Sequence, residues 1–257
     1  MTELIMDFEP ILHDWISQKE SSEYSVVPEE YCVLGVQVRG RINVYRENSF
    51  QTLDSTGITG IMTRSKTFRS EKDTTSFLIR IPPFLLASHI KIPMSEIVDQ
   101  SLSLEDIFPI SEVHNLREDC ILEFLEGKKP GWAWNRFRSE LRTFKEEPKY
   151  LRESIKRIRL QNGETSISSM ASDLGISLSK LEKDYKLVLG LSPKEYACLV
   201  RFRKAVDLKV KSSNLTDLAH RAGYYDQAHF IREFKKRTGK SPKYWFRSNI
   251  NVETEES

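Results

Sequence analysis

Cysteines are few in this chain, and no apolar run is long. The three cysteines among its 257 residues, Cys32, Cys120 and Cys198, are odd in number and far apart. That pattern favours free thiols in a reducing compartment over a disulfide framework. No apolar stretch is long enough to span a bilayer, and the acidic N-terminus lacks the basic and apolar regions of a secretory signal. We therefore expect a cytoplasmic location and no membrane partner.

The motifs of common enzymes are also absent. The sequence has no Gly-x-Ser-x-Gly and no His-Glu-x-x-His, and its five histidines show no metal-ligand spacing with the cysteines. Cys32 lies in an apolar stretch, which fits a buried small residue better than a reactive thiol. We therefore expect no enzymatic activity, no metal and no cofactor.

One short motif resembles a nucleotide site. Gly239-Lys240-Ser241 matches the end of a phosphate-binding loop. Such a loop needs another glycine where Phe234 stands, and it follows a strand rather than an apolar helical stripe. A helix that ends at Gly239 explains the motif better.

Charge is divided unevenly along the chain. The net charge is only +2, yet residues 151–250 hold 21 Lys and Arg against 10 Asp and Glu, whereas residues 1–150 hold 18 against 24. A basic C-terminal part suggests a polyanionic partner, although a well-solvated helical surface would have the same composition. The fold has to decide between these two interpretations.

The N-terminal part has the pattern of strands. Apolar residues alternate on both sides of Gly40, which predicts a hairpin with one buried face, and Pro82-Pro83 ends the last strand. The aromatic residues of this part fit either a pocket or a packed core. They are Tyr31, Tyr45, Phe50, Phe68 and Phe77.

From Ser111 the apolar residues follow a helical period. The stripe within 112–125 predicts a helix that ends near Gly127, and we expect it to form a dimer interface. Trp132 and Trp134 fit a packed core and an interaction surface equally well. The members of the stripe are Val113, Leu116, Cys120, Ile121, Phe124 and Leu125.

The predicted class is α+β: a small β-rich regulatory domain (1–110), a helical linker or dimerisation segment (111–149), an all-α domain (150–250) and an acidic disordered tail (251–257).

A phrase occurs twice near the end of the chain. "YKLVLGLSPKEY" (185–196) and "FKKRTGKSPKYW" (234–245) align without a gap. Each closes a unit of two short helices joined by a turn, with a glycine after the first helix at Gly175 and Gly223. Two such units predict a pair of helix-turn-helix motifs rather than generic helical hairpins. Helix caps are predicted at Asp226 and at Ser192, where Ser-x-x-Glu forms a capping box.

Residues 151–247 resemble the double helix-turn-helix DNA-binding domain of AraC-type transcriptional regulators. The second unit, "LAHRAGYYDQAHFIREFKKRTGKSP", follows the family phrase, with Tyr224 in place of a phenylalanine and Tyr225 in place of a common serine. Residues 77–108 are similar to the end of the N-terminal domain in a subgroup whose effector is unassigned. The resemblance implies a bacterial transcription factor that acts on double-stranded DNA as a homodimer, with RNA polymerase and a small-molecule or protein effector as further partners.

The second helix of each unit would enter the major groove. Its core-facing residues are Leu181 and Tyr185 in the first unit and Phe230 and Phe234 in the second. Glutamine suits adenine, Arg and Lys suit guanine, alanine suits a thymine methyl, and glutamate needs a cytosine. The groove-facing residues predicted from these positions are Ser179, Lys180, Glu182, Lys183, Gln227, Ala228, Ile231 and Arg232.

Two functions fit all of these features. The first is a sequence-specific transcription regulator that reads two adjacent major-groove segments and is modulated through its N-terminal domain. In the second, the basic domain only tethers to DNA an N-terminal domain that binds a protein partner or catalyses a reaction. Base readout would come from the recognition helices, and Lys235, Lys236 and Arg237 would contribute phosphate contacts.

Overall fold

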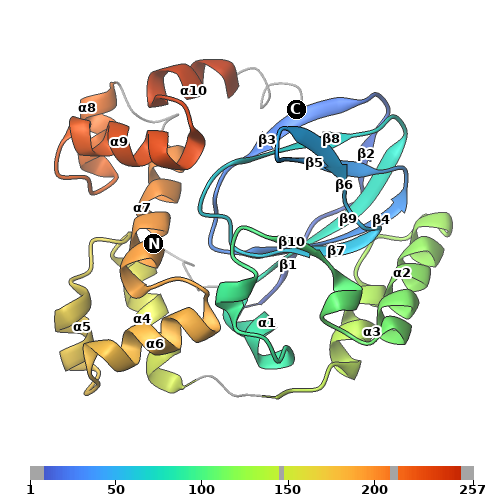
Figure 1. Ribbon diagram of the computed structural model, residues 1–257, viewed down its shortest axis with the longest axis horizontal. Helices are drawn as coiled ribbons and strands as arrows, with labels where there is room; N and C mark the ends of the chain where they lie inside the picture. The colour runs from blue at the N-terminus through green and yellow to red at the C-terminus, as the bar shows by residue number, and fades with distance from the viewer. Residues whose placement is uncertain (1–8, 145–147, 209–213, 250–257) are drawn as a thin grey trace.

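Two antiparallel sheets form the N-terminal part of the molecule, and helices form the rest (Figure 1). The structure is a computed structural model that describes residues 9–144, 148–208 and 214–249. The predicted α+β class, β-rich first and all-helical last, is confirmed. The expected tail, 251–257, lies outside the described residues.

The larger sheet has the strand order β1-β9-β4-β7-β10, and β2 also pairs with β9. Alternation along β4 and β9 gives it two different faces. Leu34 and Phe77 belong to the face that packs against helices, whereas Gly35 and Leu78 face the other sheet. The strands are β1 (Ile11–Leu12), β2 (Ile16–Gln18), β4 (Cys32–Arg39), β7 (Thr56–Thr59), β9 (Thr74–Ile81) and β10 (Ser101–Ser103).

The smaller sheet has the order β3-β8-β5-β6 and lies opposite the larger one (Figure 1). The predicted hairpin around Gly40 is wrong, because β4 and β5 lie in different sheets and do not pair. The chain changes sheets at Gly40, where φ is +72° and a Cβ atom would lie 2.4 Å from Thr74 Oγ1. Both flanking runs bury one face, so their alternation alone does not reveal the partner strand. The strands are β3 (Ser22–Val26), β5 (Ile42–Arg46), β6 (Ser49–Thr52) and β8 (Lys66–Ser70).

Helices cover the outer face of the larger sheet. The predicted stripe on α2 is buried there at Val113, Leu116 and Cys120, so that these residues cannot form the expected dimer interface. Glu123 accepts hydrogen bonds from the first main-chain N–H groups of α3, at Trp132 (2.8 Å) and Ala133 (3.2 Å). The elements are α1 (Pro83–His89), 3-10 helices η1 (Met94–Glu96) and η2 (Leu104–Asp106), α2 (Ile110–Leu125) and α3 (Trp132–Glu140).

The C-terminal part consists of two helical groups joined by one long helix, α7 (Figure 1). Each group has its own core, centred on Tyr185 and Tyr196 in the first and on Phe230 and Phe234 in the second. Within the described ranges, no helix combines the length and apolarity needed to cross a bilayer. The helices are α4 (Lys149–Leu160), α5 (Ile167–Asp173), α6 (Leu178–Val188), α7 (Pro193–Leu208), α8 (Leu215–Arg221), α9 (Gln227–Thr238) and α10 (Pro242–Asn249).

Candidate nucleic-acid interface

Helices α5 and α6 form the first helix-turn-helix unit. The hydroxyl of Ser177 accepts a hydrogen bond from Lys180 N at 3.2 Å and caps the start of α6. Leu181 and Tyr185 are fully buried, as expected, and Ala171 of α5 is buried beside them. Burial of this one face of α6 leaves its opposite face for a partner.

Helices α8 and α9 repeat the arrangement. The predicted cap at Asp226 is confirmed, since its carboxylate accepts from His229 N at 2.6 Å. Phe230 and Phe234 are fully buried. Gly239 ends α9 in the left-handed conformation (φ +72°), and α10 begins at Pro242, so the Gly-Lys-Ser motif is a helix exit followed by a helix entry.

The predicted capping box at the start of α7 is also confirmed. Glu195 N donates to Ser192 Oγ at 3.2 Å, and Ser192 N donates to Glu195 Oε2 at 2.8 Å. The hydrogen bond from Ser192 N holds the pKa of the Glu195 carboxyl below its usual value. This box fixes the start of the helix that joins the two units.

On α6 the predicted groove-facing residues are all exposed. They are Ser179, Lys180, Glu182 and Lys183. Lys180 also forms an ion pair with Asp184 (Nζ to Oδ2, 3.2 Å), which lies one turn further along the same helix. Lys183 therefore has the less engaged cation of the two.

On α9 the predicted residues differ in their environment. Ala228 and Arg232 are exposed, and no ion pair or hydrogen bond with another described residue engages the Arg232 side chain. Gln227 is half-buried and accepts a hydrogen bond from Thr216 Oγ1 at 2.6 Å. Ile231 is half-buried and packs against the core of the second unit, which leaves less of it for a base.

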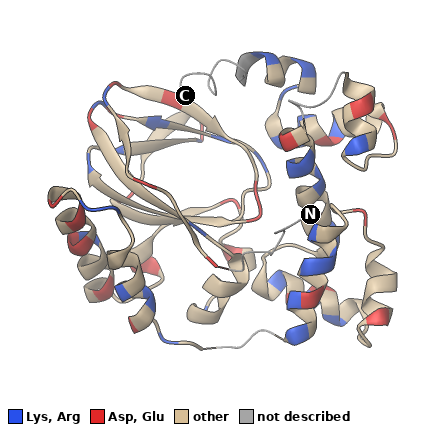
Figure 2. Cartoon of the chain, turned by 180° about the vertical axis from the view of Figure 1, so that it is seen from behind, with Lys and Arg blue, Asp and Glu red and all other residues tan. Residues whose placement is uncertain are grey.

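Lys and Arg recur along the C-terminal helices (Figure 2), and three of those on α7 are engaged by other residues of the protein. Arg201 donates to the carbonyl of Gly163 at 2.5 Å, Arg203 pairs with Asp207, and Lys204 lies 3.8 Å from Glu164. The expected phosphate contact of Arg237 is wrong for this conformation, because its side chain is buried against Phe202 and donates to Thr63 O at 3.4 Å.

One exposed aromatic residue beside α9 was not among the predicted site residues. Tyr225 lies in the turn directly before the Asp226 cap and is 87% exposed. Its position places the ring at the start of the recognition helix, beside the residues predicted to face the groove. The sequence signal was present, since Tyr225 replaces the small serine of the family pattern at this position.

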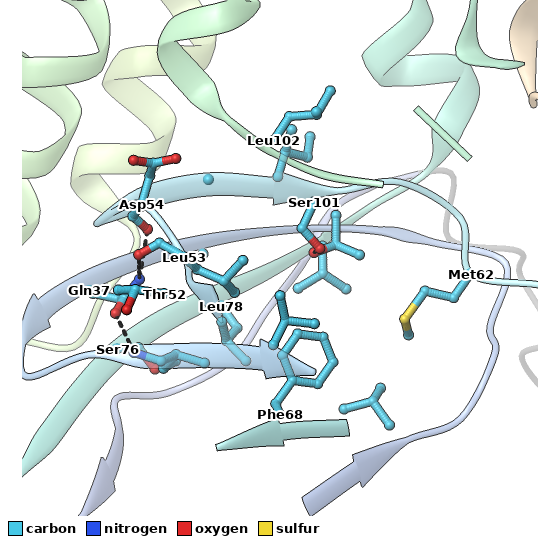
Figure 3. A pocket seen from close by; sticks show the side chains of 18 of the residues that line it. Gln37, Thr52, Leu53, Asp54, Met62, Phe68, Ser76, Leu78, Ser101 and Leu102 are labelled. Carbon is cyan, nitrogen blue, oxygen red and sulfur yellow. Dashed lines mark hydrogen bonds between the residues drawn. The ribbon is translucent and has the colours of Figure 1, made fainter. Parts of the chain in front are cut away.

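A cavity of about 380 Å³ lies between the two sheets (Figure 3). Phe68, Met62 and Leu78 point into it, and Gln37 lies at one end, where its side chain donates to Asp54 O at 2.6 Å. Of the aromatic residues considered for a pocket, Phe68 lines this cavity, whereas Phe77 packs on the opposite face of the larger sheet.

Two arginines and one histidine stand among the apolar residues of the cavity wall. Arg46 donates to the carbonyl of Ser101 at 2.9 Å, and Arg80 donates to Glu29 Oε2 at 2.8 Å. Burial and the nearby Arg80 lower the pKa of His13, which favours its neutral form. The wall thus suits a small organic molecule with a largely apolar body and a few polar groups.

No metal site is found in the part of the chain that the structure describes, since no three His, Cys, Asp or Glu side chains group closely enough there. The buried Cys32 and Cys120 are poor nucleophiles, because burial raises the pKa of each thiol to about 12.

The geometry defines a protein with two helix-turn-helix units, and comparison with known proteins gives their family. Residues 170–248 match the family model described as a helix-turn-helix domain. Residues 170–248 therefore carry a helix-turn-helix domain, and the helix-turn-helix part of the resemblance seen in the sequence is confirmed.

Among curated proteins, the chain is 31% identical over 81 residues to the HTH-type transcriptional activator RhaS of Escherichia coli. The match covers 31% of this chain and 29% of RhaS, so it spans less than a third of the relative. ToxT from Vibrio cholerae covers 92% of this chain at 10% identity with a TM-score of 0.49. The C-terminal domain of AraT from Geobacillus stearothermophilus, a response regulator, covers 39% of the chain at 27% identity with a TM-score of 0.37.

Proposed function

We propose that this protein is a sequence-specific, cytoplasmic transcription regulator that reads two adjacent major-groove segments with α6 and α9. The observation that carries the proposal is the pair of recognition helices, each capped at its start and buried on one face. The single helix α7 joins the two units. Two such helices on one linker fit successive turns of the major groove.

The base contacts would come from exposed side chains on the two recognition helices. Arg232 and Lys183 would pair with guanine, Gln227 with adenine, and Ala228 would meet a thymine methyl. Ser179, Lys180, Glu182 and Ile231 complete the proposed surface. Tyr225 at the start of α9 would contact the backbone at the edge of the groove.

The N-terminal part would regulate this activity. We assign the regulatory role to residues 1–110 with the helices of 111–149, and DNA binding to 150–250. The cavity between the sheets would bind a small-molecule effector, which supports the first of the two functions that the sequence left open. RNA polymerase would be the partner of the DNA-bound protein.

Homodimerisation belongs to the same proposal. The buried stripe of α2 is unavailable, but the helix also exposes Leu122 (55%) and Leu125 (73%), and Trp132 at the start of α3 is 57% exposed. These exposed apolar side chains are the interface residues that we propose. Trp134, in contrast, is a core residue (3% exposed).

Selection from a random DNA library tests the proposal directly. The full-length protein is expected to enrich one sequence, and the enriched fragment should resist a large excess of nonspecific competitor in a gel-shift titration. Equal competition on every fragment would contradict sequence-specific regulation and would leave only a DNA tether.

A further inference from the structure

A short loop segment lies between the cavity and the C-terminal helices. Glu29, Glu30 and Tyr31 connect β3 to β4. Glu29 lines the cavity and accepts a hydrogen bond from Arg80, another residue of the cavity wall, at 2.8 Å. The Nε atom of Arg80 is buried and has no hydrogen-bond partner among the described residues. Arg80, a residue of the cavity wall, therefore keeps one buried donor unsatisfied.

The next two residues of the segment face a second arginine, which belongs to α4. Glu30 Oε1 lies 3.8 Å from Arg159 Nε. The ring of Tyr31 lies near both arginines, with its centroid 5.6 Å from Arg80 Cζ and 5.5 Å from Arg159 Cζ. Cation–π attraction in a partly desolvated place is strong enough to hold such an arrangement. Tyr31 thus joins an arginine of the cavity wall to an arginine of α4, which belongs to the first helical group.

Buried contacts continue from Arg159 to the recognition helix. Arg159 Nε donates to the hydroxyl of Tyr196 at 2.8 Å. The ring of Tyr196 packs edge-on against Tyr185 of α6, with centroids 6.1 Å apart. Both tyrosines are fully buried, and Tyr185 is held further by Ser154 (3.0 Å). Close-packed interiors transmit displacements, because they have little free space to absorb them.

The residues just before this segment contact the second unit. Val27 packs against the core that contains Phe230 and Phe234, and Pro28 is buried. A displacement of the connection between β3 and β4 would therefore shift residues that contact both helical groups.

We infer that Glu29–Tyr31 is a coupling segment that links the occupancy of the cavity to the position of recognition helix α6. A ligand group that binds Arg80 competes with Glu29 and Tyr31 for the same guanidinium. The position of the Tyr31 ring relative to Arg159 then changes. Because coupling between two sites is reciprocal, DNA binding would also change the affinity of the cavity for its ligand. The inference rests on the proposed function and names its regulation.

Two variants break the connection at different points. Arg80→Met removes the guanidinium and keeps an apolar stem, and Tyr31→Leu removes the ring between the two arginines. Two controls match them. Tyr31→Phe keeps the ring, and Arg69→Met removes an equivalent arginine on β8, which pairs with a glutamate (3.0 Å) and stacks on a phenylalanine ring (3.7 Å).

Hydrogen exchange in the full-length protein without DNA is the first readout. The amides of α6 are expected to exchange at least about fivefold faster in Arg80→Met and Tyr31→Leu than in the wild type. They should exchange at the wild-type rate in both controls. A purely local effect on β9 would leave α6 unchanged, and that result would overturn the inference.

Affinity for the enriched DNA is the second readout. Both variants are expected to change Kd at least about fivefold in the same direction, the low end of measured site-to-site couplings. The double variant should change Kd no further, because both substitutions interrupt one connection. Additive effects, or a Kd within twofold of the wild type, would contradict the coupling. If the wild type enriches no sequence, the proposed function fails, and hydrogen exchange still decides the coupling.

Discussion

Replacing Arg232 with alanine is expected to weaken binding to the enriched DNA about 5- to 150-fold. Arg232 is exposed on α9, and within the described part of the chain no ion pair or hydrogen bond engages its side chain. Its removal should therefore leave the free energy of unfolding within about 0.5 kcal/mol of the wild type. A bidentate contact to guanine is worth about 1–3 kcal/mol of discrimination, and each 1.4 kcal/mol is about tenfold in Kd.

Titration by fluorescence anisotropy at several salt concentrations separates base contact from phosphate contact. Loss of a base contact lowers affinity only for the enriched sequence and leaves the salt dependence unchanged. Lys235→Ala is the matched control, because Lys235 is an exposed cation in the last turn of the same helix. If it touches phosphate, it should weaken all sequences alike and reduce the salt slope by about one. The same behaviour in Arg232→Ala would refute the assignment of Arg232 to a base edge.

Three further predictions concern the fold. Asp226→Ala should lower the free energy of unfolding by about 0.5–2 kcal/mol, because α9 loses its cap; an unchanged denaturant midpoint would contradict this. Gly190→Ala should lower Tm more than Gly175→Ala. Both glycines have positive φ, but of the two only Gly190 would bring a Cβ atom close to a main-chain carbonyl, at 2.7 Å. Equal Tm values would count against a close contact with η1. Iodoacetamide at pH 8 should label the half-exposed Cys198 before Cys32. Burial raises the pKa of Cys32 to about 12 and keeps its thiol protonated. Mass spectrometry that finds Cys32 labelled first would overturn that ranking.

The helix-turn-helix part could be predicted from the sequence because its signals are local. Glycines that end helices, capping residues and apolar residues one turn apart act within a few positions of each other. The caps at Ser192 and Asp226 follow from signals of this kind. The structure confirms both of them.

The N-terminal part could be predicted only in outline, because its decisive contacts join distant residues. The alternation around Gly40 predicts two strands but cannot show that they lie in different sheets. Arg237 has the same chemistry as its basic neighbours, and only its contact with Thr63, far away in the sequence, reveals that it is buried. The contacts of Glu29 and Tyr31 likewise could not be predicted, because the arginines that they meet lie on other elements.

Chemical footprinting of the enriched DNA is the most direct test of the central claim, that one chain reads two adjacent major-groove segments. Methylation of guanine N7 reports contacts in the major groove. The protein should protect two short groups of guanines whose centres lie about 10–10.5 base pairs apart, one turn of the duplex. Arg232→Ala should abolish protection in the group read by α9 and leave the other intact. A single protected group, or no protected guanine, would contradict the claim.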